Sequence, residues 1–169
     1  MRYLSYAAML IVGYVLQSTL LELIAILDIK PNLILITVIS IALLRGEMEG
    51  AAVGFFGGLL MDTFSPFIGI NTFIGMITGY LAGLLTKGFY KENPFVPVSA
   101  VFIGTFFYNF LFYVLSILLK GYTDFGYFFN TIILREMVYN ALVTLPIYGI
   151  IYFINSVIEV KEHFKRKLF

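Results

Sequence analysis

Five ionisable or strongly polar side chains lie within or beside the long apolar runs of this sequence: Gln17, Glu22, Asp62, Arg135 and Glu136. Glu22 and Asp62 are of the residue type that forms general acid–base pairs, but no nucleophile, histidine or metal-ligand cluster accompanies them. We therefore expect no enzymatic activity. Two other interpretations remain open.

In the first interpretation, these side chains form a polar patch that engages a partner's transmembrane or extracellular segment, or they line a cavity. In the second, Arg135 pairs with Glu22 or Asp62 and fastens the helices together. Charged groups inside an apolar layer are costly and usually face a partner or the interior of a bundle, so both interpretations can hold at once.

The composition excludes several other kinds of site. The chain has no Cys and one His, His163, so neither a disulfide framework nor a His-based metal site is expected. The net charge of +1 argues against a nucleic-acid partner. The glycines at 54–58 do not lie between a strand and a helix, so they are no phosphate-binding loop. We expect no cofactor.

The elements that must position the polar residues are long apolar helices. Apolar residues make up 60% of the chain and charged residues 12%. No charged residue lies between Leu4 and Leu21 or between Phe95 and Leu119. About 20 apolar residues at a rise of about 1.5 Å cross the hydrocarbon core of a bilayer. The pattern predicts one all-α, polytopic membrane domain over 1–169 with six spans, at about 4–27, 31–44, 50–64, 67–87, 95–119 and 133–157.

The second and third predicted spans are short. Fourteen residues form a helix of only about 21 Å, against a core of about 30 Å. A re-entrant hairpin is the alternative, but its apex would bring Arg45, Glu47 and Glu49 to mid-membrane, which is costly. We favour two short spans.

The basic residues predict the orientation. With six spans, eight of the eleven Lys and Arg residues fall on the side that holds both termini. The positive-inside rule then places both termini in the cytoplasm and the loop at 120–130 outside. The basic tail at 161–169 is expected to set this topology and to contact anionic lipid, and contact with a cytoplasmic protein is the alternative. The aromatic residues at 122–129 either lie along the outer membrane surface or present an apolar face to a partner.

Glycines recur at intervals of four in the third and fourth segments. Small residues at this spacing form a flat stripe on which a second helix can approach closely. We interpret them as packing the two segments on each other, and a stripe that receives a partner's helix is the alternative. The residues are Gly50, Gly54, Gly57, Gly58, Gly75, Gly79 and Gly83.

Taken in order, several motifs resemble the rod shape-determining MreD family of bacteria. They are Gln17-Ser18-Thr19, Pro31-Asn32-Leu33-Ile34-Leu35, the stretch from Gly54 to Asp62, and Gly69. The stretch from Gly54 to Asp62 is the most specific, and the motifs cover about residues 15–85. Asn32 departs from the family, which often carries Asp there.

The resemblance implies a non-enzymatic scaffold of the lateral cell-wall elongation machinery in the bacterial cytoplasmic membrane. Its implied partners are MreC, the cytoskeletal MreB, RodA and the transpeptidase that works with RodA, together with membrane lipid. The family is similar in fold to the substrate-binding components of energy-coupling-factor vitamin transporters. A vitamin-type binding subunit is therefore the alternative function, and a polar-lined pocket that opens outward would distinguish it. Ala7 and Ala8 have no Ala four residues on, which departs from the docking motif of those components.

The orientation is testable by cysteine labelling, because the natural chain contains no Cys. A Thr123→Cys variant is expected to react with a membrane-impermeant maleimide in intact cells, since the loop is predicted to be external. The unmodified chain measures the background. Labelling that requires broken cells contradicts the orientation.

Overall fold

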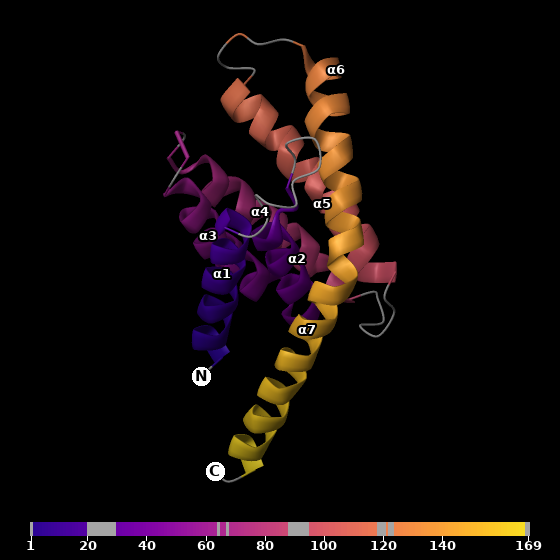
Figure 1. Cartoon of the computed structure of the whole chain (residues 1–169). Coiled ribbons are helices and arrows are strands. Elements are labelled where there is room, and N and C mark those ends of the chain that lie inside the picture. Colours follow the sequence, from indigo (N-terminus) through magenta and orange to yellow (C-terminus); the bar gives the residue numbers. More distant parts are fainter. Residues whose placement is uncertain are drawn as a thin grey trace.

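Every regular element in the described residues is helical (Figure 1). The computed structural model describes residues 2–19, 30–63, 65–66, 68–87, 95–117, 121 and 124–167, with side chains up to 160. The elements are α1 (Arg2–Thr19), α2 (Leu33–Arg45), α3 (Glu47–Asp62), α4 (Ile70–Leu84), η1 (Leu85–Lys87), α5 (Phe95–Phe112), η2 (Tyr113–Ile117), α6 (Phe125–Phe128), η4 (Phe129–Ile133) and α7 (Leu134–Lys167).

Helix α2 lies at the centre of the bundle. Every residue from Leu33 to Leu44 is buried, and the helix packs against α1, α3, α4, α5 and α7. A helix that is apolar on all sides is stable only where neighbours cover every side. Polar residues mark its ends: Asn32 caps its first turn by accepting the Leu35 N–H at 3.0 Å, and Arg45 is its last residue.

Helices α3 and α4 touch through their backbones. A Cβ atom added to Gly54 would lie 2.1 Å from the carbonyl oxygen of Gly75, and one added to Gly50 would lie 2.4 Å from that of Gly79. Gly57 faces the other way, toward Ile34 of α2. Glycine is therefore required for the α3–α4 contact, since any larger residue would force the two backbones apart.

Successive helices run in opposite directions, so polar residues gather at two ends of the bundle. At the end that holds both termini, Glu49 pairs with Arg2 at 3.3 Å and accepts the Tyr6 hydroxyl at 3.0 Å (Figure 1). There the Arg45 Nε also donates to the Asn155 Oδ1 at 2.5 Å. We call this end of the bundle the terminal end. We call the opposite end, which holds the start of α2 and the end of α3, the far end.

The second half of the chain forms a long helical hairpin that extends past α1–α4 at the far end (Figure 1). Its arms are α5–η2 and α6–η4–α7. Aromatic rings join them: the centroid of Phe125 lies 5.9 Å from that of Phe110 and 5.1 Å from that of Tyr113. Residues Phe95–Ser116 and Phe125–Val160 are long and apolar enough to cross a membrane by length and composition.

The element boundaries differ from the predicted spans in several places, and α3 begins at Glu47 rather than at Gly50. The predicted loop at 120–130 is helical from Phe125, because Asp124 caps that turn by accepting the Tyr127 N–H at 3.0 Å and the following rings pack on α5. Helix α7 continues to Lys167 rather than ending near 157. Helix α4 begins at Ile70, after Gly69 at φ +89°. The predicted residues 20–27 of the first span lie outside the described residues.

The α3–α4 contact predicts a sharp difference between two glycine variants. Gly54→Ala is expected to lower the free energy of unfolding by about 1–3 kcal/mol, since its Cβ overlaps the Gly75 backbone. Gly149→Ala in α7 is the matched control, because its Cβ meets nothing within 4 Å. Thermal unfolding of the detergent-solubilised variants measures both. Equal melting temperatures would show that the helices do not depend on close approach.

Candidate functional site

Polar side chains in or next to each of the longer helices form a layer at the far end of the bundle. A polar group in apolar surroundings is costly unless it is hydrogen-bonded, so the partners of each group define what it can do. Besides the predicted Gln17, Asp62 and Glu136, the layer contains residues that the sequence analysis did not single out as site residues: Asn32, Asn71, Thr72, Thr105, Tyr108, Asn109 and Asn140. All but Gln17 and Glu136 are buried.

Asp62 is buried and caps the N-terminus of α4 from the last residue of α3. Its carboxylate accepts the backbone N–H groups of Gly69, Asn71 and Thr72 at 2.9–3.1 Å. It also accepts the Asn71 amide at 3.0 Å and the Thr72 hydroxyl at 2.5 Å. A helix N-terminus favours negative charge, so the site stabilises this carboxylate without a basic residue.

Arg135 does not join the layer. Its side chain is exposed, and no ion pair connects it to Asp62 within the described residues. Asp62 therefore fastens α3 to α4 through the α4 N-terminus and not through Arg135. Glu22, the other predicted partner of Arg135, lies outside the described residues.

Tyr108 links the Asp62 cap to α5. Its hydroxyl donates to the Asn71 Oδ1 at 2.7 Å and lies 3.6 Å from the Met61 sulfur. The next residue, Asn109, belongs to a second cluster around Glu136. Because neighbouring residues of α5 belong to the two clusters, they form one continuous layer.

Glu136 of α7 is surrounded by asparagine amides. Asn109 donates to its Oε2 at 3.0 Å, Asn140 donates to its Oε1 at 3.4 Å, and the Asn32 side chain is a third hydrogen-bond partner. Asn140 in turn donates to the Thr105 hydroxyl at 3.0 Å and accepts the Asn32 N–H at 2.8 Å. This one asparagine therefore holds α2, α5 and α7 together.

Gln17 connects α1 to the same end, where its Oε1 accepts the Ile34 N–H at 3.4 Å. It thereby satisfies one of the first free N–H groups of α2.

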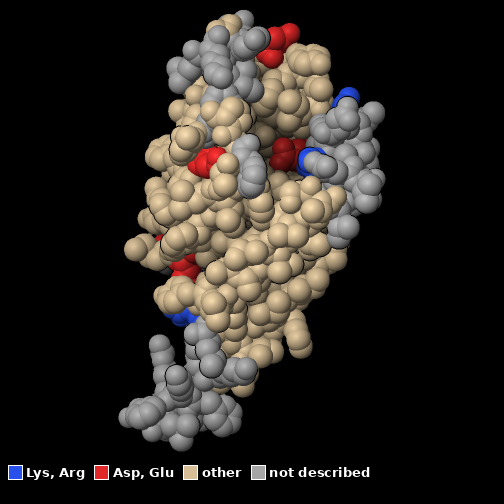
Figure 2. Space-filling model, turned by 60° about the vertical axis from the view of Figure 1, so that its left-hand side comes forward, with Lys and Arg blue, Asp and Glu red and all other residues tan. Residues whose placement is uncertain are grey.

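The visible face of the molecule carries few charges, and one carboxylate lies in a hollow of its upper half (Figure 2).

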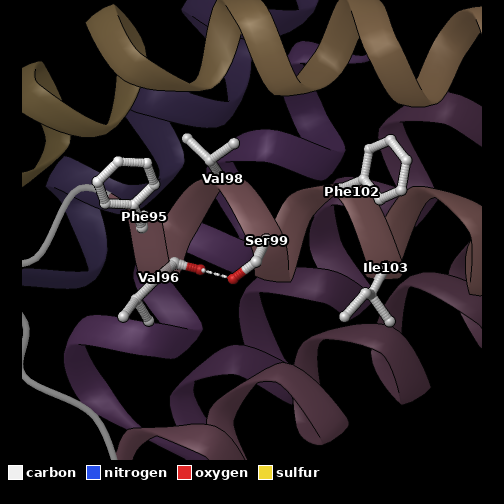
Figure 3. Close-up of a pocket in the computed structure, with 6 residues that line it drawn as sticks. All are labelled: Phe95, Val96, Val98, Ser99, Phe102 and Ile103. Carbon is white, nitrogen blue, oxygen red and sulfur yellow. Dashed lines mark hydrogen bonds between the residues drawn. The ribbon is translucent and has the colours of Figure 1, made fainter.

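A separate, apolar hollow of about 380 Å³ lies along α5 (Figure 3). Its lining residues are Phe95, Val96, Val98, Ser99, Phe102 and Ile103. The only hydroxyl in this lining, that of Ser99, donates to the Val96 carbonyl at 3.0 Å. The hollow thus offers no free side-chain polar group to orient a vitamin-type ligand.

Two signals in the sequence could have revealed the missed residues. Asn109 and Asn140 are amides within otherwise apolar runs, and each has a polar residue four positions earlier, Thr105 and Glu136. That spacing places each pair on one helix face. In the described part of the chain, no three His, Cys, Asp or Glu side chains gather as metal ligands.

The described residues thus define an all-helical protein whose buried polar side chains bind one another and join its helices. The model of the rod shape-determining protein MreD family matches residues 1–157, and the chain belongs to this family. The family is membrane-associated and shape-determining, and it is not a known enzyme family. No curated protein and no solved structure matches the chain. The expected fold likeness to energy-coupling-factor components is therefore unsupported.

The Asp62 cap predicts a loss of stability when its charge is removed. Asp62→Asn replaces one acceptor oxygen by an amide that faces N–H donors, so the free energy of unfolding is expected to fall by about 1–3 kcal/mol. Asp124→Asn is the matched control, since Asn also caps a helix and Asp124 is exposed. Thermal unfolding of the isolated protein compares the two. Unchanged stability of Asp62→Asn would show that the cap is dispensable.

Proposed function

We propose that this protein is a non-enzymatic scaffold of the lateral cell-wall elongation machinery in the bacterial cytoplasmic membrane. The observation that carries the proposal is the family match over residues 1–157 of 169. In this proposal the chain is one polytopic domain with both termini in the cytoplasm. It binds MreC directly, and through MreC it reaches MreB, RodA and the RodA transpeptidase.

The surface chemistry supports a location in the bilayer. Large apolar side chains are exposed along every long helix except the central α2, including Ile11, Phe56, Phe73, Ile103 and Phe153. Soluble monomers rarely expose so much contiguous apolar surface. Both termini lie at one end of the bundle, as an even number of spans requires (Figure 1).

The layer supports a role in binding rather than in chemistry. Asp62 and the surrounding amides are occupied by internal hydrogen bonds, which makes the bundle a rigid support. A protein without a reacting group influences its partners only by binding one of their states more tightly than another. We infer that this scaffold stabilises MreC in the state that engages the synthases.

Complementation tests the proposal. Deleting the encoding gene from its own bacterium is expected to produce round cells, and the wild-type chain should restore rods. Gly54→Leu should fail to restore them because it separates α3 from α4, whereas Gly149→Ala should succeed. Tagged wild-type chain purified in mild detergent should recover MreC. Rod-shaped deletion cells, or absence of MreC from the purified material, would contradict the proposal.

A further inference from the structure

Glu136 differs from the other carboxylates that hold the described bundle together. Glu49 pairs with Arg2, Glu159 lies 3.9 Å from Arg45, and Asp62 caps a helix N-terminus. Glu136 has only neutral amide donors, and no ion pair reaches it within the described residues. The N-terminus of α2 lies beside it, because the α2 cap residue Asn32 is one of its hydrogen-bond partners.

The amides hold this charge in place but do not balance it. Asn32, Asn109 and Asn140 come from three different elements and hydrogen-bond both carboxylate oxygens. An ionised carboxylate has about four lone-pair sites, so one is left over. Glu136 is also only partly buried, unlike the amides around it, so part of its side chain is open to a partner.

The depth of the site favours a side chain over a lipid headgroup. Helix α5 continues as η2 for eight residues beyond Asn109, and α6 begins eleven residues before Glu136. At about 1.5 Å a residue, Glu136 lies about 12–16 Å below the far end of the hairpin. The headgroup region is only about 5–8 Å thick on each side. A charged side chain at such a depth is costly and usually pairs with an opposite charge.

We propose that Glu136, held by Asn32, Asn109 and Asn140, binds a Lys or Arg side chain from the membrane segment of the protein partner. This inference rests on the proposed scaffold function and identifies the chemistry of its partner contact. Unlike the buried Asp62, Glu136 is partly exposed and takes part in no ion pair within the described residues, so a partner's cation can pair with it. In the apolar surroundings this attraction is far less screened than in water.

The test measures the association of this chain with MreC from the same bacterium by energy transfer between labels on the two proteins, both reconstituted in the same vesicles of defined lipid. Glu136→Gln is expected to weaken binding by about tenfold or more, because the partner's cation loses its counter-charge. Asp124→Asn removes an exposed carboxylate from the same hairpin and is expected to bind as the wild type does. Leaving phosphatidylethanolamine out of the vesicles should change neither result.

A second variant keeps the test valid if Glu136→Gln fails to fold. In Glu136→Asp the carboxylate stays at the same partly exposed position of α7, on a stem that is one CH₂ shorter. The net charge is retained, so binding within about fivefold of wild type is expected. Loss of binding by this folded variant would overturn the inference.

The partner residue is found by changing each Lys and Arg in and beside the MreC membrane segment to Gln. One of these variants is expected to lose about as much affinity as Glu136→Gln, with no further loss when the two are combined. If Glu136→Gln binds MreC with wild-type affinity, the inference is overturned while the scaffold function stands. The same holds if no MreC residue shows this coupling. A dependence on phosphatidylethanolamine would assign the site to a lipid headgroup and also overturn it. If wild-type MreC does not bind at all, the proposed function itself fails.

Discussion

Polar groups inside an apolar bundle must find their hydrogen-bond partners among their neighbours, and the arrangement of this protein depends on how the far end meets that constraint. Asp62 binds the first turn of α4, Tyr108 extends the bonding to α5, and Asn140 joins α5 to α7 and to the cap of α2. Each bond crosses between elements. Leaving one buried polar group unpaired costs more free energy than a single hydrogen bond contributes. These hydrogen bonds are therefore stable only when all the helices are in the same register.

The glycine contact and the Asp62 cap specify the same register between α3 and α4. A Cβ atom on Gly58 would lie 2.3 Å from the Asn71 carbonyl oxygen and 2.4 Å from the Thr72 Cα. Asn71 and Thr72 are also the residues that donate to Asp62. Only a glycine one turn before Asp62 allows the first turn of α4 to come close enough for its N–H groups to reach the carboxylate.

The two ends of the bundle manage charge differently. At the terminal end, Glu49 and Glu159 lie within 4 Å of arginines, so the charges there are largely balanced within the chain. At the far end, Asp62 is balanced by a helix N-terminus, and Glu136 is surrounded by neutral amides. In the proposed complex, this rigid frame keeps Glu136 from finding an alternative partner within the chain.

Much of the fold could be predicted from local sequence. Long uncharged runs can satisfy their backbone only as helices, which is why α5 and α7 were expected close to where they lie. Glycines four residues apart must share a face, so the stripe itself was predictable. The helical turn at Phe125 was not expected, because the Asp124 cap is supplemented there by ring contacts with α5 that only the tertiary structure provides.

The candidate site depended on tertiary structure. Arg135 and Glu136 are adjacent in sequence, yet one is exposed and the other lies among amides, because consecutive residues of a helix point about 100° apart. Asn32, Asn109 and Asn140 lie in three separate segments, and nothing local indicates that they meet. The sequence by itself determined that the protein is helical and apolar. Only the packing of α2 between α5 and α7 decided which polar groups satisfy each other, since hydrogen bonds act over about 3 Å and depend on the final contact.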